Sequence, residues 1–149
     1  MKVFLCLAFL LCWYICGLDA NGNSPKYSEA LQLFPGRLET WPYHGYSAAN
    51  WICLAYLESR YNTKAVNNKG PSRNYGIFQI NSKWWCNDGE TAGAEDACQI
   101  SCQSLLNDDI HDDIECAKQV MRDSNDTSTW AAWRNYCSVR KVDRFMKGC

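Results

Sequence analysis

The sequence lacks an excess of charge of either sign. It has 15 Lys and Arg residues against 16 Asp and Glu, which gives a net charge of −1 at pH 7. This balance excludes a strongly basic nucleic-acid binder and gives no general attraction to anionic surfaces. The chain also lacks a collagen-like period, low-complexity tracts and repeats at solenoid spacing. Its 149 residues, 47% of them hydrophobic, suffice for one globular domain and hardly for two.

A hydrophobic run long enough to span a bilayer is missing as well. Residues 3–18 are almost entirely apolar, and Ala20-Asn21-Gly22 supplies small residues at the spacing that signal peptidase cleaves. A run of 16 residues is short for a transmembrane helix, which needs about 20. We therefore predict a cleaved signal peptide over residues 1–22, a secreted protein without a membrane span, and one domain over residues 23–149.

The cysteines are numerous, which points to an oxidising compartment. Three of the ten lie in the predicted signal peptide, which leaves Cys53, Cys86, Cys98, Cys102, Cys116, Cys137 and Cys149. Because seven is an odd number, at least one is free or paired between chains. A zinc site is disfavoured, since Cys98 and Cys102 have no second pair at finger-like spacing and the two histidines are far apart in the sequence. We expect disulfides.

The apolar periodicity predicts helices on either side of a small β region. Ser47 is a good N-cap for a helix through residues 48–59. Two later patterns predict an amphipathic helix and another short helix. They are carried by Ile110, Ile114, Ala117 and Met121, and by Trp130, Trp133 and Tyr136.

The β region is expected between these helices. Residues 67–74 are turn-forming, residues 75–81 look like one strand of a short hairpin, and residues 87–89 form a turn. Helices and strands grouped in separate blocks indicate an α+β fold.

Glu58 is a candidate acid. It lies beside the apolar stripe of the first helix, where lost solvation raises the pKa of a carboxyl and suits it to donate a proton. The alternative is a surface glutamate paired with Arg60 or Lys64.

Trp84 and Trp85 are candidate ligand-binding aromatics. In an extended segment, adjacent side chains point to opposite faces, so one ring would face solvent or a groove and stack on a sugar. The alternative is that the two rings fill two small cores.

Residues 107–113 concentrate negative charge. Asp108, Asp109, Asp112 and Asp113 repel one another, and only His111 lies among them. A calcium ion would relieve this repulsion through oxygen ligands, although the spacing is not that of an EF-hand. Solvated acids at a helix N-terminus are the other explanation.

The segments 50–63, 74–89 and 130–137 together resemble the c-type lysozyme and α-lactalbumin family. The match runs from about Tyr43 to Cys149, with a one-residue deletion within residues 67–74. The resemblance implies an α+β fold of two lobes, one helical and one a small antiparallel sheet, with a cleft between them. It also implies the disulfides Cys53–Cys137, Cys86–Cys102 and Cys98–Cys116.

One departure from the family concerns the fourth disulfide. Cys149 is present, but residues 23–41 contain no cysteine to pair with it, and Pro35-Gly36 would break a first helix there. We expect a monomer in which Cys149 is free. The alternative is an intermolecular disulfide through Cys149.

The other departure concerns the catalytic pair. By resemblance, Glu58 matches the proton-donating acid and Asn74 matches the partner carboxylate that forms or stabilises the glycosyl intermediate. An amide keeps the shape of the side chain but carries no negative charge. Removing a group aimed at developing charge typically costs about 10²–10³ in rate. We therefore expect impaired hydrolysis.

Other positions match the sugar-binding groove of the family, and Trp130 among them would help to keep Glu58 dry. They are Gln79, Asn81, Trp84, Trp85, Asp123 and Trp130. Asn125, in an N-glycosylation triplet, lies near the upper lip of this groove by the same match, where a glycan would hinder long polymers.

The resemblance also implies a calcium site in the elbow that precedes the predicted amphipathic helix of Ile110, Ile114, Ala117 and Met121. It implies side-chain ligands from Asn107, Asp112 and Asp113, and backbone carbonyls from Ser104 and Asp109. Asn107 replaces an aspartate, so weaker binding is expected. Bound calcium would move the charge of the mature chain from −1 to about +1.

Three functions are compatible with these residues. The first is a secreted lysozyme-type glycosidase acting on β-1,4-linked N-acetylhexosamine polymers such as peptidoglycan or chitin. The second is a lysozyme-like protein that binds such glycans without turnover. The third is an α-lactalbumin-like regulatory subunit, against which Glu58, the tryptophans and Thr129 argue, since α-lactalbumin carries an aromatic residue at this last position.

Overall fold

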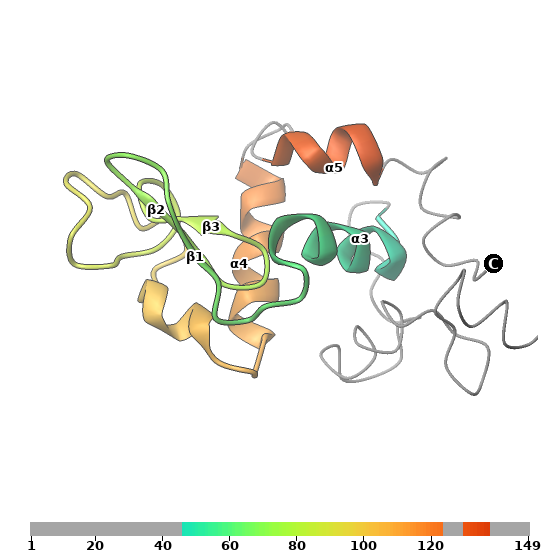
Figure 1. Ribbon diagram of the computed structural model, residues 1–149. Helices are drawn as coiled ribbons and strands as arrows, with labels where there is room; N and C mark the ends of the chain where they lie inside the picture. The colour runs from blue at the N-terminus through green and yellow to red at the C-terminus, as the bar shows by residue number, and fades with distance from the viewer. Residues whose placement is uncertain (1–45, 124–129, 138–149) are drawn as a thin grey trace, which may run out of the picture.

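The computed structural model describes residues 46–123 and 130–137 (Figure 1). The sheet, the long loop after it and the short helix η2 lie on one side and α3 and α5 on the other, with α4 contacting both β3 and η2. The elements are α3 (Ala48–Ser59), β1 (Val66–Asn68), β2 (Arg73–Tyr75), β3 (Ile80–Asn81), the 3-10 helix η2 (Cys102–Leu106), α4 (His111–Asp123) and α5 (Ala131–Tyr136). This architecture confirms the predicted α+β class. The predicted signal peptide, the cysteine-free residues 23–41, Asn125 and Cys149 lie outside the described residues.

Helix α3 begins and ends where its sequence directs. Ser47 is the N-cap, as predicted, and its backbone N–H donates to Asn50 Oδ1 at 2.9 Å. The helix stops because Arg60 and Tyr61 adopt left-handed conformations, with φ of 56° and 64°. The Arg60 N–H donates to the carbonyl oxygen of Tyr56 at 2.9 Å, which satisfies one of the terminal carbonyls.

The three strands form an antiparallel sheet in the order β1-β2-β3. Asn67 pairs with Asn74, and Asn74 pairs with Asn81, so three asparagines form one row across the sheet. Cross-strand partners project from the same face. Asn74 is therefore flanked by an amide side chain on each neighbouring strand.

The prediction of one strand over residues 75–81 was wrong. Tyr75 ends β2, a turn follows, and only Ile80 and Asn81 form β3. The turn requires positive φ at both ends, 74° at Gly76 and 55° at Gln79. The turn expected over residues 67–74 is likewise shorter, because both of its ends belong to β1 and β2.

This turn, residues 76–79, joins the sheet to the helices. Ile77 and Phe78 are fully buried. Ser59 Oγ, at the end of α3, donates to the Ile77 carbonyl at 2.8 Å. Trp130 Nε1 donates to the Phe78 carbonyl at 2.9 Å. Tertiary hydrogen bonds thus replace the strand pairing that the local sequence favours.

The later helices follow the predicted patterns, with one exception. Ile114 and Ala117 of α4 are buried, as is Trp133 of α5. Tyr136 lies in α5 as expected, but its side chain is 62% exposed and does not extend the buried stripe. No helix among the described residues is long and apolar enough to cross a membrane.

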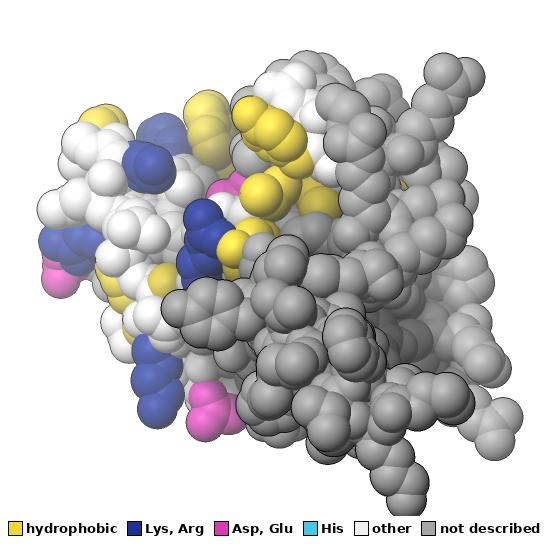
Figure 2. Space-filling model, turned by 45° about the vertical axis from the view of Figure 1, so that its right-hand side comes forward, with side chains coloured by type: hydrophobic (Ala, Val, Ile, Leu, Met, Phe, Trp, Pro, Cys, Tyr) yellow, Lys and Arg dark blue, Asp and Glu magenta, His cyan; other side chains and the backbone are white. Residues whose placement is uncertain are grey.

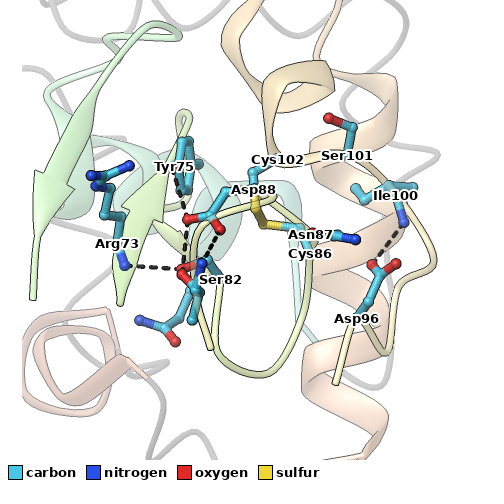
Figure 3. The surroundings of a disulfide bond; sticks show 12 residues. Arg73, Tyr75, Ser82, Cys86, Asn87, Asp88, Asp96, Ile100, Ser101 and Cys102 are labelled. Carbon is cyan, nitrogen blue, oxygen red and sulfur yellow. Dashed lines mark hydrogen bonds between the residues drawn. A yellow bond between two sulfur atoms is a disulfide. The ribbon is translucent and has the colours of Figure 1, made fainter. Parts of the chain in front are cut away.

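All three predicted disulfides are present. Cys53–Cys137 joins the two helices α3 and α5, and Cys98–Cys116 joins the loop to α4. Cys86–Cys102 ties the loop after β3 to η2 (Figure 3). The loop that follows the sheet is therefore fixed at two points.

Candidate active site

A groove of about 490 Å³ lies along the sheet and the turn after it. The described residues that line it are one cation, three carboxamides and two indoles, with no carboxylate among them. The lining residues are Lys69, Asn74, Gln79, Asn81, Trp84 and Trp85. Five of these six were expected, and Lys69 was not.

The two tryptophans lie in a turn, so the expectation of an extended segment was wrong. The Trp85 N–H donates to the Asn81 carbonyl at 3.0 Å. Trp84 is nevertheless 49% exposed, whereas Trp85 is partly buried against the core. Lys83 Nζ lies 5.8 Å from the centroid of the Trp84 ring. One indole therefore offers a free face at the groove, as the sequence suggested.

Glu58 lies in the last turn of α3, next to the serine that holds the turn of residues 76–79. Burial raises the pKa of its carboxyl to about 7, and the positive charge of Lys69 opposes this rise. Among the described residues the ion pairs are Arg73–Glu90 and Lys118–Glu115, so the alternative of a surface pair with Arg60 or Lys64 is not seen.

Lys69 connects Glu58 to the groove. Its side chain lines the groove together with Asn74, and its charge acts on the Glu58 carboxyl. Figure 2 shows hydrophobic side chains, basic side chains and a recessed acidic side chain beside one another on one face of the molecule. A carboxyl that is protonated near neutral pH can donate a proton to a ligand bound there.

Asn74 is held by its neighbour in the row. Asn81 Nδ2 donates to Asn74 Oδ1 at 2.7 Å and to Ser72 Oγ at 3.0 Å. On the other side, Asn67 Nδ2 donates to Gln79 Oε1 at 2.7 Å. The amide row is thus a connected network.

The loop after β3 supports the strand that carries Asn74. Tyr75 Oη donates to Asp88 Oδ2 at 3.0 Å, and the Arg73 N–H donates to Ser82 Oγ at 2.9 Å (Figure 3). Both chain neighbours of Asn74 are therefore anchored. Burial raises the pKa of Asp88, but the N–H groups of Thr91 and Glu90 and two hydroxyls outweigh it and hold this pKa well below its usual range.

Two expected groove residues lie apart from the groove lining. Trp130 is buried at the start of α5, where it donates to Phe78. Asp123 is exposed at the end of α4 and accepts from Gln119 Nε2 at 3.3 Å.

In the elbow before α4, three of the expected calcium ligands are hydrogen-bonded to one another. Asn107 Nδ2 donates to the Ser104 carbonyl at 2.8 Å, and Asn107 Oδ1 accepts from the Asp109 N–H at 2.7 Å. Asp112 is exposed. Within residues 46–123 and 130–137, no group of three or more His, Cys, Asp or Glu side chains is arranged to hold a metal.

Asp113 stands out in this elbow. It is 1% exposed, and no well-aligned hydrogen bond from the described residues reaches its carboxylate oxygens. Burial raises the pKa of the Asp113 carboxyl to about 7, although the backbone N–H groups of Asp113 itself and of Ile77 still lie near enough to lower this pKa. Burial outweighs these two N–H groups, so the carboxyl would be stabilised by a proton or a cation.

Sequence reasoning missed Lys69 and Asn67. Both lie in the segment that was read as a turn. The signal that could have found them is a spacing of seven, since Asn67, Asn74 and Asn81 are equally spaced across two hairpins. Predicting a hairpin here would have placed Asn67 opposite Asn74 and Lys69 two residues further along the chain, opposite Ser72.

Comparison with known proteins identifies the family. The profile of the C-type lysozyme/alpha-lactalbumin family matches residues 32–149. The chain is 54% identical to Lysozyme C-1 of Sus scrofa over 107 residues, 72% of this chain and 84% of that protein. It is 51% identical to Lysozyme C of Dromaius novaehollandiae over 151 residues, 100% of this chain and 99% of that protein. This chain belongs to the C-type lysozyme/alpha-lactalbumin family.

Proposed function

We propose that this chain is a secreted lysozyme-type glycosidase. Its substrates are β-1,4-linked N-acetylhexosamine polymers, such as peptidoglycan and chitin. Glu58 donates the proton, and activity is reduced because Asn74 is neutral. The relatives named above carry the name lysozyme, which supports the reaction class.

One observation carries this proposal. The Glu58 carboxyl has its pKa raised to about 7 by burial, and it feels the charge of Lys69, which lines a groove whose exposed indole offers a stacking surface for a sugar ring. A general acid works best when its pKa lies near the working pH. A surface glutamate with an ordinary pKa would be almost fully ionised there.

The experiment compares hydrolysis of chitin oligomers and bacterial cell walls by the wild type, Glu58→Gln and Asn74→Asp. We expect slow cleavage by the wild type and none by Glu58→Gln, since glutamine has no proton to donate. Asn74→Asp should gain about 10²–10³ in rate, because it restores an anion facing the developing positive charge. A wild type as inert as Glu58→Gln would exclude the enzyme.

The second candidate is a lysozyme-like protein that binds glycans without turnover. The neutral Asn74, in a groove that keeps its carboxamides and both tryptophans, favours it. This protein would bind chitotriose with equal affinity as wild type and Glu58→Gln, and neither would cleave it. The α-lactalbumin-like regulatory role has no such observation in its favour.

We also propose a weak calcium site in the elbow before α4. Ser104 and Asp109 would supply carbonyl oxygens, and Asn107, Asp112 and Asp113 side-chain oxygens, which is the ligand chemistry that calcium takes. The buried carboxyl of Asp113, which makes no well-aligned hydrogen bond with the described residues, supports it. Binding must displace the hydrogen bond from Asn107 to the Ser104 carbonyl, which weakens the site.

Thermal melts in Ca²⁺ and in EGTA test this site. Calcium should raise the midpoint of the wild type slightly and that of Asn107→Asp more, because the aspartate adds charge and removes the competing donor. Asp113→Asn should show no calcium response. Identical wild-type midpoints would remove the site.

The proposal that the protein is secreted includes a cleaved signal peptide, a glycan on Asn125 and a defined state of Cys149. Non-reducing mass spectrometry of the secreted protein would show cleavage after residue 20 or 22, a glycan on Asn125, and Cys149 either free or joined to a second chain. A chain that keeps residues 1–22 would contradict the predicted signal peptide.

A further inference from the structure

We propose that Asn74 presents an amide N–H to the groove, and that the nucleophile in this protein is the 2-acetamido oxygen of the substrate itself. This inference rests on the proposed glycosidase function and goes further, because it names the group that replaces the missing carboxylate. It restricts the substrates to sugars with an N-acyl group at the cleaved position.

The orientation of the Asn74 amide is fixed by a backbone group. The Lys83 N–H donates to Asn81 Oδ1 at 2.9 Å. A backbone N–H can only donate, so the oxygen of Asn81 must face it and Nδ2 must face the other way. This Nδ2 donates to Asn74 Oδ1, which leaves Asn74 Nδ2 directed away from Asn81.

The other carboxamides of the network are committed to internal partners. Asn67 Nδ2 donates to Gln79 Oε1, and Gln79 Nε2 donates to the carbonyls of Gly76 and Ala65 at 3.0 and 3.3 Å. No partner of Asn74 Nδ2 is found within the described part of the chain. Asn74 therefore brings a spare donor to a groove that it lines.

A spare N–H donor complements a hydrogen-bond acceptor on the ligand. The strongest neutral acceptor on an N-acetylhexosamine is the acetamido carbonyl oxygen. Among the described residues, the groove lining includes no carboxylate that could act as the nucleophile, and an amide is a poor one. Glycosidases without a protein nucleophile can use the acetamido group of the substrate instead.

The reaction then has two steps. Glu58 donates its proton to the glycosidic oxygen while the C1–O bond breaks, and the electron pair of that bond leaves with the oxygen. The acetamido oxygen of the same sugar bonds to C1 and forms a cyclic oxazolinium ion. Asn74 holds this oxygen beside C1 through one lone pair while the other lone pair attacks.

Water completes the reaction. The Glu58 carboxylate takes a proton from water as the water oxygen bonds to C1. The bond between C1 and the acetamido oxygen breaks, and its electron pair returns to the carbonyl. The neutral acetamido group and the protonated Glu58 are restored, C1 keeps its configuration after two inversions, and water is the only co-reactant.

The test uses chitotetraose and its N-trifluoroacetyl counterpart, since fluorine makes the carbonyl oxygen a weaker nucleophile. The wild type should cleave the fluorinated oligomer about tenfold or more slowly, which corresponds to at least about 1.4 kcal/mol in the barrier. Asn74→Asp is the matched control, because its carboxylate can attack C1 and its rate should depend much less on the acyl group.

The outcomes separate the two proposals. Equal wild-type rates on both oligomers would overturn the acetamido nucleophile and leave the glycosidase intact. No cleavage of either oligomer by the wild type would overturn both. A steep loss with the fluorinated oligomer that persists unchanged in Asn74→Asp would overturn the role given to Asn74.

Discussion

Glu58 can act only while its carboxyl holds a proton, and the pKa of this carboxyl is about 7. Activity of the wild type should therefore fall as the pH rises through about 7. Because Asn74 cannot ionise, no acid limb from a second carboxyl is expected. The pH–rate profile should be a single falling curve.

Asn74→Asp provides the comparison for this profile. Its new carboxylate must be ionised to act, so activity should also fall at low pH and the curve should become bell-shaped. The measurement is the initial rate on a chitin oligomer from pH 3 to 9. A bell-shaped wild-type curve would mean that another carboxylate takes the partner's place.

Lys69, which lines the groove, also affects the pH at which Glu58 loses its proton. Its positive charge lowers the pKa of Glu58, so Lys69→Gln should move the falling limb to higher pH. Lys64→Gln is the control, because Lys64 is exposed and does not line the groove. Equal shifts in both variants would show a general charge effect rather than a local one.

The turn of residues 76–79 is the element on which the site depends. A Cβ at Gly76 would lie 2.4 Å from the Leu105 carbonyl oxygen and 2.6 Å from Asp113 Oδ1, at a φ of 74°. Gly76→Ala should cost about 2–5 kcal/mol, from left-handed strain and overpacking together. Denaturant unfolding measures this loss.

Gly70→Ala measures the cost of the left-handed backbone conformation without crowding. Gly70 has a φ of 73°, but nothing lies within 4 Å of an added Cβ. Its cost should be only about 1–2 kcal/mol. Similar losses for the two variants would show that the crowding around Gly76 is relieved by small shifts.

This turn also marks how far the sequence could predict the fold. Helix α3 and its Glu58 were predictable, because capping and apolar spacing are local properties. The turn was read as a strand because Ile77, Phe78 and Ile80 favour strands. Its conformation is set by Ser59 and Trp130, which are distant in the sequence.

Some residues of the site could be predicted from the sequence and others could not. Trp84 and Asn81 could be placed at the groove from the family resemblance. Lys69 could not, since its place depends on a hairpin in the segment that differs from the family by a deletion. The hydrogen bond of Asn107 to Ser104 was also beyond the sequence, because it depends on the path of the backbone in the elbow.

At the scale of the whole molecule, the disulfides differ in how much chain they constrain. Cys53–Cys137 closes a separation of 84 residues, and Cys86–Cys102 closes only 16. In the chain-entropy description, these loops stabilise the fold by about 4.6 and about 3.1 kcal/mol. All four cysteines are buried, so replacing them by alanine loses similar contacts.

The two loop lengths predict which disulfide contributes more to the free energy of unfolding. The double variant Cys53→Ala/Cys137→Ala should lose more stability than Cys86→Ala/Cys102→Ala, measured by denaturant unfolding under non-reducing conditions. The reverse order would show that the links of the loop to η2, and not the closure of the long loop, dominate the stability of the molecule.

Proton donation by Glu58 requires a carboxyl that keeps its proton near neutral pH. The most direct measurement is a carboxyl ¹³C NMR titration of the glutamates, with the Glu58 signal assigned by its absence in Glu58→Gln. We predict a midpoint of about 7 for Glu58. A midpoint at the ordinary value of 4.5 would contradict the proposed proton donor.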